Sequence, residues 1–557
     1  MHDLPAPRPD DWSDAYDVVI VGTGAAGLTA GIAAARRGLK SLGIEKASLW
    51  GGTSALSLGG VWVPANRLML EAGCQDSTEN AIQFLRNVVP PDGIATASDR
   101  QVAFVENAPR MVDELIEAGM QWDVEAEHPD YVSEDPNAAV GRCLDERVFN
   151  GKKLGPWLKT LRPSAFPYAV QLADLPLMGK GNMRRLGYVV LRHYGRKLVG
   201  QAPLGAGSSL VAQLMTILQR YQVPVWLETS LQEIVVDAGK AVGVVVRCKG
   251  RTRRVAARAG VILCSGGFAH DADLRRQQHH TTGALSSASP DDTGDVIKMA
   301  EGIGAMTQLS DDAWWATTYV MPDGSVSASH FERSVPFGLC VGSDGNRFVN
   351  ESWDYYHFAR AIVRRGGEPV WLIFESRHRK KYPFLGNPPG ITPRWMVKSG
   401  FLKTATSVAE LASKCGIDEA NLLATVERFN NFARTGIDEE FHRGESKYDR
   451  HWGDPAQQPN PNLGPIERAP FYAAQVHAGD LGTKGGFVTD ANAQVLSKDG
   501  KPIEGLYASG NATASIMGKS YPGPGVTLGP AMAFAYLAAE HAAERRSHME
   551  RPTRQSS

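Results

Sequence analysis

Residues 16–45 read YDVVIVGTGAAGLTAGIAAARRGLKSLGIE, and this stretch decides the fold. A short apolar run over residues 16–22 leads directly into the glycine-rich turn GTGAAG, and the alanine-rich segment from Leu28 to Arg37 predicts a helix after it. A second apolar strand follows over residues 40–45 and ends on an acidic side chain. This order is that of the βαβ unit that binds dinucleotides. The stretch therefore predicts a Rossmann-type α/β fold that holds the ADP part of a cofactor.

The glycines of this turn have separate physical roles. Gly22 permits the tight turn, Gly24 lets a pyrophosphate approach the backbone, and Gly27 lets the helix pack closely on the strand. The phosphates are then expected at the N-terminus of the helix. Glu45 can accept hydrogen bonds from the adenosine ribose hydroxyls, and its charge would repel the 2′-phosphate of NADP.

Composition excludes several other classes of protein. The chain has 557 residues with 59 basic and 60 acidic side chains, a net charge of −1, so it is not a generically basic nucleic-acid binder. Hydrophobic residues make up 43% and charged residues 21%, which is typical of a globular protein with more than one core. The six cysteines are scattered, without CxxC or metal-ligand spacing, and indicate a reduced compartment and no metal site.

Three separated pieces of the chain carry features of one nucleotide-binding domain. Besides the first βαβ unit, strand signals over residues 223–263 end at Gly266 and Gly267, and a C-terminal piece runs from residue 505 into an apolar helix. We predict a discontinuous FAD-binding domain over residues 1–305 and 475–557. The intervening stretch, residues 306–474, is predicted to form an inserted α+β domain that holds the substrate.

Several motifs resemble those of the fumarate reductase and succinate dehydrogenase flavoprotein superfamily and, within it, the 3-oxosteroid 1-dehydrogenases. The resemblance covers nearly the whole chain. The motifs that carry it are VVIVGTGAAGL, GGTSALSLGGVWVP, VILCSGGF, DDAWW, RFVNES and, most specifically, SYPGPGVTLGPAMAFAYLAA from Ser520. The implied activity is flavin-dependent 1,2-dehydrogenation of a 3-oxosteroid in steroid degradation.

The resemblance implies FAD as the cofactor, with its ring facing the inserted domain. Attachment is expected to be non-covalent, because residues 47–60 lack the histidine that succinate dehydrogenases use. One dinucleotide fingerprint follows a strand, so an external electron acceptor such as a quinone is expected in place of a nicotinamide site. The predicted FAD-binding residues are Gly22, Gly24, Ala25, Ala26, Gly27, Glu45, Lys46, Gly52, Thr53, Ser54, Ser57, Gly59, Gly60, Gly266, Gly267, Asp295, Gly510, Asn511, Val526, Thr527 and Leu528.

The expected chemistry removes two hydrogens from adjacent carbons beside a ketone. It needs a base for the acidic proton, a hydride acceptor, which is the flavin, and donors that polarise the carbonyl. The turn at residues 521–525, YPGPG, offers a phenolic hydroxyl and a backbone N–H at a glycine. By resemblance, Tyr521 and Gly525 hold the 3-keto oxygen and stabilise the enolate.

The base of the family is a tyrosine of the inserted domain. Residues 350–358 read NESWDYYHF and match the family's NES-x-P-Y pattern at Tyr355, except that Asp354 replaces the proline. This departure leaves Tyr356 and Tyr319 as alternatives. A free tyrosine titrates near pH 10, so a base of this kind needs neighbouring donors. By resemblance, Tyr131 has that supporting role.

Two polar pairs favour structural roles. Asp311 and Asp312 precede two tryptophans, and we interpret them as acids that cap or end a segment while the tryptophans line the pocket. His279 and His280 lie in the polar run RRQQHHTTG without matching carboxylates, which predicts a solvated loop.

Residues 151–200 form a basic, aromatic-rich insertion. They contain one acid, Asp174, and ten basic side chains, a local charge of +9: Lys152, Lys153, Lys159, Arg162, Lys180, Arg184, Arg185, Arg192, Arg196 and Lys197. This mixture is typical of a segment that lies on an anionic membrane surface, from which a water-insoluble steroid would reach the site. The alternative is a lid whose cations face acidic regions of the same protein.

Other interpretations remain open at the level of sequence. The chain lacks signal-peptide layout and any run of about 18 apolar residues, so a cytoplasmic protein, associated at most with a membrane surface, is expected. The alternatives to 1,2-dehydrogenation are a 3-oxo-5α-steroid 4-dehydrogenase, a fumarate-reductase-like flavoenzyme, and a flavin-binding electron-transfer subunit without turnover.

Overall fold

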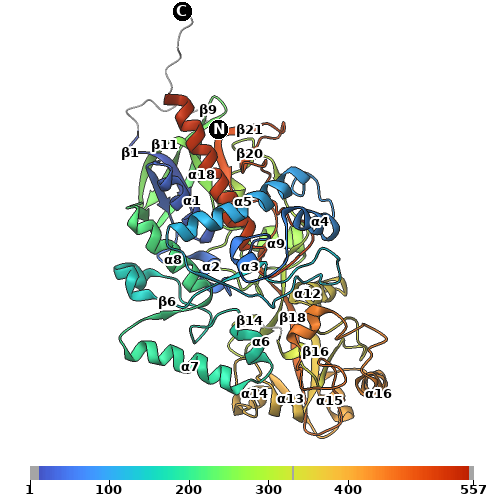
Figure 1. Ribbon diagram of the computed structural model, residues 1–557. Helices are drawn as coiled ribbons and strands as arrows, with labels where there is room; N and C mark the ends of the chain where they lie inside the picture. The colour runs from blue at the N-terminus through green and yellow to red at the C-terminus, as the bar shows by residue number, and fades with distance from the viewer. Residues whose placement is uncertain (1–11, 329–330, 551–557) are drawn as a thin grey trace, which may run out of the picture.

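A computed structural model describes residues 12–328 and 331–550 (Figure 1). Its largest sheet has eight strands in the order β20-β21-β10-β11-β1-β2-β8, with β9 paired to β10. The bounds of these strands are β1 Asp14–Val21, β2 Ser41–Ile44, β8 Val225–Trp226, β9 Thr229–Asp237, β10 Lys240–Cys248, β11 Arg251–Leu263, β20 Gln494–Leu496 and β21 Pro502–Ala508.

The centre of this sheet is parallel. β1 pairs in parallel with β2 on one side and with β11 on the other, and β21 is parallel to β11. Val18, Val19 and Ile20 are almost fully buried, as expected for a strand that is covered on both faces. The carboxyl ends of β1, β2, β11 and β21 therefore meet at one edge of the sheet, although these strands come from three distant parts of the chain.

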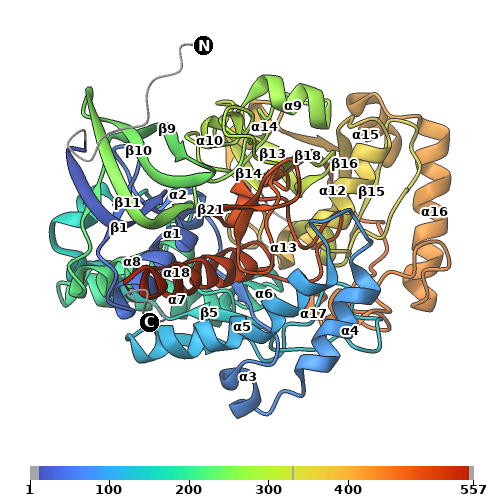
Figure 2. The same ribbon diagram turned by 90° about the horizontal axis from the view of Figure 1, so that it is seen from above.

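Helices cover this sheet, and α1 contacts both α8 and α18, while α18 also contacts α5 (Figure 2). Their small side chains suit this close packing, since α1 and the first half of α18 are rich in alanine. The helices of this part are α1 Ala25–Arg36, α2 Gly52–Leu56, α3 Arg67–Glu71, α4 Thr78–Val88, α5 Ser98–Glu117, α8 Ala206–Arg220, α9 Ala272–His279, α10 Asp295–Lys298 and α18 Leu528–Glu550.

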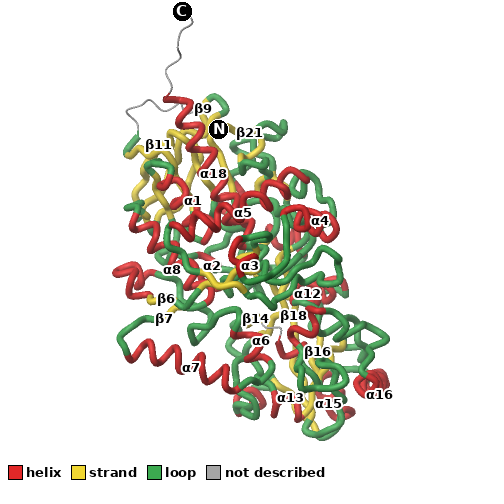
Figure 3. Tube along the Cα trace, in the orientation of Figure 1, coloured by secondary structure: helices red, strands yellow, loops and turns green. Residues whose placement is uncertain are grey.

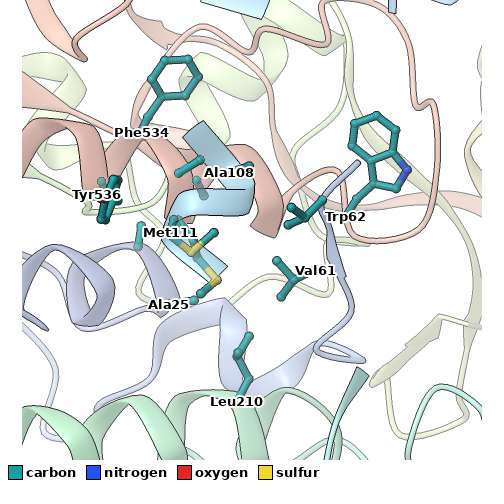
Figure 4. Packing of buried hydrophobic residues seen from close by; sticks show 14 of the residues in the cluster. Ala25, Val61, Trp62, Ala108, Met111, Leu210, Phe534 and Tyr536 are labelled. Atoms are coloured by element: carbon teal, nitrogen blue, oxygen red, sulfur yellow. The ribbon is translucent and has the colours of Figure 1, made fainter. Parts of the chain in front are cut away.

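The largest hydrophobic cluster lies between these helices. Figure 4 shows Ala25 of α1, Leu210 of α8, Met111 of α5 and Phe534 of α18 around one core. Trp62 belongs to the same cluster and stacks on Phe104 at a ring separation of 6.0 Å. Trp62 is part of a small sheet whose strands are β3 Val61–Trp62, β4 Trp122–Val124 and β5 Cys143–Glu146.

A six-stranded sheet with its own helices forms the lower right part of Figure 1. Its strand order is β14-β13-β18-β16-β15, with β17 paired to β18. The strands are β13 Ala313–Val320, β14 Val326–Ala328, β15 Gly338–Val341, β16 Val370–Glu375, β17 Leu402–Ala405 and β18 Phe471–Thr483, and the helices are α11 Phe331–Ser334, α12 Tyr355–Arg364, α13 Ser376–Lys381, α14 Arg394–Lys398, α15 Val408–Cys415, α16 Glu419–Thr435 and α17 Lys447–Trp452.

The strand β18 crosses the domain boundary that the sequence suggested. It pairs with β13 as far as Thr483, beyond residue 474, and β12 (Thr307–Gln308) pairs with β19 (Gly486–Phe487) just after it. The division of the chain into residues 1–305, 306–474 and 475–557 thus stays a prediction, and its second boundary falls inside a strand.

The basic insertion is largely helical. It begins with a 3₁₀ helix at Gly151–Thr160 and continues with α6 (Asp174–Gly179) and α7 (Met183–Leu198), flanked by the paired strands β6 (Phe149–Asn150) and β7 (Pro203–Leu204). Figure 3 shows α7 at the lower left of the molecule, joined to the rest by loops. Among residues 12–328 and 331–550, the longest apolar stretches of helix fall short of what crossing a membrane requires.

Candidate active site

The predicted dinucleotide turn lies between β1 and α1. Gly22 has φ +105°, and an added Cβ would lie 2.3 Å from the carbonyl oxygen of Cys264 at the end of β11. An added Cβ on Gly27 would lie 2.0 Å from the oxygen of Gly22. Gly24 precedes α1 and offers no side-chain cap to its first turn. The turn therefore presents backbone, at a helix N-terminus, to any ligand that lies at this edge of the sheet.

The acid at the end of β2 is held in place beside this turn. The Glu45 carboxylate is nine-tenths buried and accepts hydrogen bonds from the Thr23 hydroxyl (2.6 Å), the Thr23 N–H (3.2 Å) and the Ala47 N–H (3.1 Å). An ionised carboxylate has about four acceptor positions, so this one retains capacity for a further donor. A ribose hydroxyl is a donor of that kind.

Small polar residues follow Glu45 and lie beside the glycine turn. Ser54 of α2 accepts a hydrogen bond from the Ala25 N–H (3.1 Å), which places α2 against the start of α1. Thr53 accepts a hydrogen bond from the Ser289 N–H (3.0 Å), and Ser57 accepts one from the Gly59 N–H (3.0 Å). This stretch brings small polar side chains alongside the glycine turn.

Lys46 and Asp295 were both predicted to bind FAD, and they bind each other. The Lys46 ammonium lies 2.7 Å from the Asp295 carboxylate at the start of α10 and also donates to the Thr293 hydroxyl. Gly266, which follows β11, has φ +78°, and an added Cβ would lie 2.7 Å from Oδ1 of Asp292. Burial raises the pKa of Asp292 to about 7, and Asp292 Oδ1 has no hydrogen-bond partner among the described residues.

The C-terminal piece contributes the last group of predicted FAD-binding residues. Gly510 and Asn511 follow β21, and Val526, Thr527 and Leu528 stand where α18 begins. A small pocket is lined by Gly510, Asn511, Val526 and Thr527, among others. Ligands of open α/β sheets bind outside the carboxyl ends of the strands, where these predicted residues gather.

The residues present fit a dinucleotide. Close backbone approach at Gly22 and Gly27, a helix N-terminus without a side-chain cap, and a held acid with spare acceptor capacity are the features that such a ligand needs. A second helix N-terminus, that of α18, lies by the pocket beyond Gly510 and supplies partial positive charge there. The site residues themselves remain predictions.

Three of the predicted catalytic residues are tyrosines that lie together. The Tyr355 hydroxyl donates to the Tyr521 hydroxyl at 2.7 Å. The Tyr131 ring stacks on that of Tyr521 at 5.4 Å, and the Tyr131 and Tyr355 rings meet edge to face at 5.6 Å. The three side chains come from the loop after β4, the start of α12 and the turn before α18.

Hydrogen bonds to backbone groups explain where two of these tyrosines lie. Asp354 caps α12 by accepting hydrogen bonds from the N–H groups of Tyr356 and His357, so Tyr355 is the first helical residue. The Tyr131 N–H donates to the Pro522 oxygen at 2.9 Å, which ties the loop to the YPGPG turn. The aspartate that departs from the family pattern is thus the helix cap.

Gly525 lies in the same turn and packs against β3. Its φ is +88°, and an added Cβ would lie 2.4 Å from the Gly60 oxygen. The Trp62 N–H donates to the Gly525 oxygen at 3.2 Å. This contact links the predicted ketone-binding turn to the glycine pair Gly59 and Gly60.

Burial controls the acidity of the three tyrosines. It raises the pKa of Tyr131 and of Tyr521 well above the usual value. Burial also raises the pKa of Tyr355, although hydrogen bonds with Tyr131 and Tyr521 act in the opposite direction. The hydrogen bonds with Tyr131 and Tyr521 thus favour the ionised form of Tyr355, whereas burial disfavours the ionised form of all three tyrosines.

The alternative bases, Tyr356 and Tyr319, have other hydrogen-bond partners or surroundings than Tyr355 has. The Tyr356 hydroxyl donates to Oδ2 of Asp312 at 2.6 Å, and burial followed by the charge of Asp312 raises its pKa. Tyr319 is buried in the core of the inserted sheet, where it meets Phe384 edge to face. Neither makes the contact with Tyr521's hydroxyl that Tyr355 makes.

The interpretations of the two polar pairs hold only in part, since Asp312 directly precedes β13 and Trp314 lines the pocket beside Gly510, as expected. Asp312 is buried, and its carboxylate accepts hydrogen bonds from Trp315, Tyr356 and Lys484 instead of capping a segment. His279 is also buried, at the end of α9, and its Nε2 lies 3.1 Å from the Asp312 carbonyl oxygen. Only His280 is exposed.

Sequence reasoning also missed Lys484, whose side chain is fully buried. Lys484 directly follows β18, in the stretch GDLGTKGG. The glycines on both sides of it were the one sequence signal of close backbone packing.

Comparison with known proteins agrees with this geometry. A family model described as "FAD binding domain" matches residues 17–528. A 3-oxosteroid 1-dehydrogenase of Mycolicibacterium smegmatis is 39% identical over 94% of this chain and 96% of its own length. A 4-oxocyclohexanecarboxylate 2-dehydrogenase of Sinomonas cyclohexanicum is 34% identical over 94% of this chain and 92% of its own length.

A solved structure is also similar over the whole chain. It is the 3-ketosteroid delta1-dehydrogenase from Sterolibacterium denitrificans in complex with 1,4-androstadiene-3,17-dione. It superposes with a TM-score of 0.89 at 35% sequence identity and covers 96% of this chain and 100% of its own.

Proposed function

Because the chain belongs to the FAD-binding-domain family and, within it, to the 3-oxosteroid 1-dehydrogenases, we propose that it introduces a double bond between carbons 1 and 2 of a 3-oxosteroid. The predictions of FAD as cofactor and of an oxidoreductase acting on CH–CH bonds are confirmed by these similarities. Bound FAD supplies the acceptor for the hydride that leaves carbon 1. The remaining roles fall to side chains and backbone of this protein.

The hydrogen bond between the Tyr355 and Tyr521 hydroxyls is the observation that carries the proposed mechanism. It places the two hydroxyl oxygens 2.7 Å apart. At that separation, one hydroxyl can donate to the ketone oxygen while the other reaches the proton on the neighbouring carbon. In the mechanism, the Tyr521 hydroxyl and the Gly525 N–H donate to the 3-keto oxygen and hold the negative charge of the enolate. Tyr355 takes the proton from carbon 2, and Tyr131 stabilises the Tyr355 phenolate.

The test is flavin bleaching near 450 nm after anaerobic mixing of the holoprotein with 4-androstene-3,17-dione. Tyr521→Phe removes a donor to the developing oxyanion, which typically costs roughly 10²–10³-fold in rate. Tyr355→Phe removes the base, for which a loss of roughly 10²–10⁴-fold is expected. Tyr319→Phe is the matched control and should bleach within about threefold of the wild type, and Tyr356→Phe should lose much less rate than Tyr355→Phe does.

These variants decide which tyrosine is the base. A large loss in Tyr356→Phe together with rapid bleaching in Tyr355→Phe would contradict the assignment. If 4-oxocyclohexanecarboxylate bleaches the flavin and no ketosteroid does, the substrate class is a monocyclic ketone. Bleaching by neither class, with FAD still bound, would favour an electron-transfer protein without turnover.

We also propose that the protein acts in the cytoplasm at a membrane surface, which residues 151–200 contact, and passes its electrons to an external acceptor of the quinone type. The helix α7 carries exposed apolar side chains, with Leu191 72% and Leu198 88% exposed. Tyr188 and Tyr194 on the same helix are about half exposed. Apolar and aromatic side chains of this kind suit the interface of a bilayer.

The cations of this insertion are mostly available to a partner. Arg185 and Arg192 bind Asp174, and Arg162 binds Asp291. Within the described part of the chain, the other seven cations have no carboxylate within ion-pair distance. An anionic lipid surface attracts such groups, at about 1 kcal/mol for each one near the surface.

Vesicle co-sedimentation tests this proposal. At low salt, the protein should sediment with phosphatidylglycerol vesicles and much less with phosphatidylcholine vesicles. The double variant Leu191→Ser, Leu198→Ser should bind several-fold more weakly, whereas Leu423→Ser, at an exposed leucine of α16, should not change binding. Absence of binding to anionic vesicles would contradict the proposed membrane contact of residues 151–200.

A further inference from the structure

A buried ion pair lies behind the proposed ketone-binding turn. Lys484 follows β18, and its side chain is fully buried. Its ammonium donates to Oδ2 of Asp312 (2.9 Å) and to the carbonyl oxygen of Ser520 (2.9 Å), the residue before Tyr521. Asp312 precedes β13 and Lys484 follows β18. The pair therefore connects the ends of these two strands to the turn that contains Tyr521.

Both carboxylate oxygens of Asp312 accept hydrogen bonds. Oδ1 of Asp312 accepts from Nε1 of Trp315 at 2.7 Å, and Oδ2 accepts from the Tyr356 hydroxyl at 2.6 Å. The Arg360 guanidinium lies 3.9 Å from the same carboxylate and donates to the oxygen of Lys519 at 2.9 Å. A buried ion pair is costly unless such additional bonds satisfy it, so the geometry here is that of a tightly specified pair.

The same pair contacts the side chains around the Tyr521 ring. The Lys484 ammonium lies over the rings of Trp314 and Tyr356, 4.5 and 4.2 Å from their centroids. Those two rings are themselves in contact with the Tyr521 ring, at 5.2 and 5.5 Å. Lys484 thus contacts the backbone before Tyr521 and two of the rings that flank the Tyr521 side chain.

We propose that Lys484 and Asp312 are positioning residues that fix the direction of the Tyr521 hydroxyl toward the substrate ketone. The inference rests on the proposed function, because it assigns Tyr521 the role of donor to the ketone. Lys484 and Asp312 do not themselves contact the substrate. The pair acts through Ser520, Trp314 and Tyr356, and it requires the charge of Lys484.

The charge of Lys484 is sensitive to pH. Burial lowers its pKa to about 8, against the opposing effect of Asp312. The other charged or titratable groups that face it are Tyr356, Arg360 and Asp92. A small polar pocket is lined by Lys484, Asp92, Gln308 and Ser310, among others. Ketone binding should therefore weaken as the pH rises through about 8, where Lys484 loses its proton.

The test compares Lys484→Met, Lys484→Arg and Asp312→Asn with the wild type, all as FAD-loaded protein. Binding of 1,4-androstadiene-3,17-dione, the product of the proposed reaction, is measured from the flavin spectrum between pH 6 and 10. We expect Lys484→Met and Asp312→Asn to keep FAD and to raise the dissociation constant at least tenfold at pH 7. Lys484→Arg stays charged throughout and should move the alkaline limb up by more than one pH unit.

The control is Lys414→Met, which breaks an exposed ion pair with Glu410 and should bind like the wild type. Unchanged affinity in Lys484→Met across the pH range would overturn the inference, as would an alkaline limb that is the same in Lys484→Arg and the wild type. Reduction of the flavin by 4-androstene-3,17-dione in the wild type separates the two ideas. If the wild type fails that assay, the proposed function fails on its own.

A readout without steroid keeps the inference testable in that case. 4-Fluorophenylalanine at position 521 reports the surroundings of the ring by ¹⁹F NMR and does not titrate itself. Its resonance should move between pH 7 and 9 when Lys484 is present and stay constant in the Lys484→Arg background. A resonance that is independent of pH in both backgrounds would contradict the positioning role.

Discussion

Gly22 and Gly38 differ in what surrounds them, although both have a positive φ, +105° and +77°. An added Cβ on Gly22 would lie 2.3 Å from the Cys264 oxygen, whereas none of the described atoms lies within 4 Å of one on Gly38. Gly38→Ala should therefore cost only the left-handed backbone strain, about 1–2 kcal/mol. Gly22→Ala must also move β1 from β11 and should abolish FAD retention. The measurement is flavin per chain after gel filtration, together with thermal unfolding.

The comparison isolates close approach from backbone strain. If Gly22→Ala retains FAD as well as Gly38→Ala does, the turn tolerates a side chain, and the fit to a pyrophosphate is lost. If both variants lose FAD equally, strain alone explains the effect.

How far a residue could be predicted from sequence depended on how local its partners are. The roles of Gly22, Gly24 and Gly27 are predicted from a motif of six residues, and the structure shows the close backbone packing expected at Gly22 and Gly27. Asp312 was misinterpreted because its partner Lys484 is 172 residues away, and only the fold brings the two together. A charged side chain that is paired across such a distance leaves no periodic or local signal.

At the scale of elements, α6 and α7 are held together by one acid. Asp174 is fully buried and binds Arg185 and Arg192 at 2.6 Å each. Asp174→Ala leaves both guanidinium groups without their counter-charge, and we expect α7 to detach locally at a cost of about 1–3 kcal/mol. Trypsin should then cleave within residues 184–197 at least fivefold faster, while the main unfolding transition changes little.

The matched control is Asp273→Ala, which removes an exposed ion pair with Arg276 on α9 and should leave cleavage unchanged. Equal cleavage in the wild type and in Asp174→Ala would mean that α7 is held by its apolar contacts.

The insertion also shows why the charge pattern was only half informative. Ten cations against one acid correctly indicated a basic surface, because most of these side chains are not neutralised within the described chain. The pattern did not indicate that the single acid is the buried anchor of two of them. Which member of a charge cluster becomes buried is decided by packing.

At the scale of the whole molecule, one sheet edge is built from three distant pieces of chain. Val21 of β1, Leu263 of β11 and Ala508 of β21 lie side by side in parallel strands. The sequence predicted this assembly because each piece ends in a recognisable glycine-rich turn. It did not predict that β18 would cross from residue 471 to 483, because a continuous strand has no boundary signal at the point where the contacts change.

Because the proposed FAD site uses three distant pieces of the chain, bound FAD should stabilise the folded state. A ligand that binds only the folded state stabilises it by RT ln(1 + [L]/Kd), about 2.7 kcal/mol at 100 times Kd. The apoprotein should therefore unfold at a lower temperature than the holoprotein, and its melting temperature should rise with added FAD. FMN lacks the adenosine that we propose the turn between β1 and α1 and the Glu45 carboxylate bind. FMN should accordingly give less than half of the shift that FAD gives at equal concentration. Equal shifts would mean that the flavin end alone joins the pieces, and the dinucleotide turn would then need another ligand.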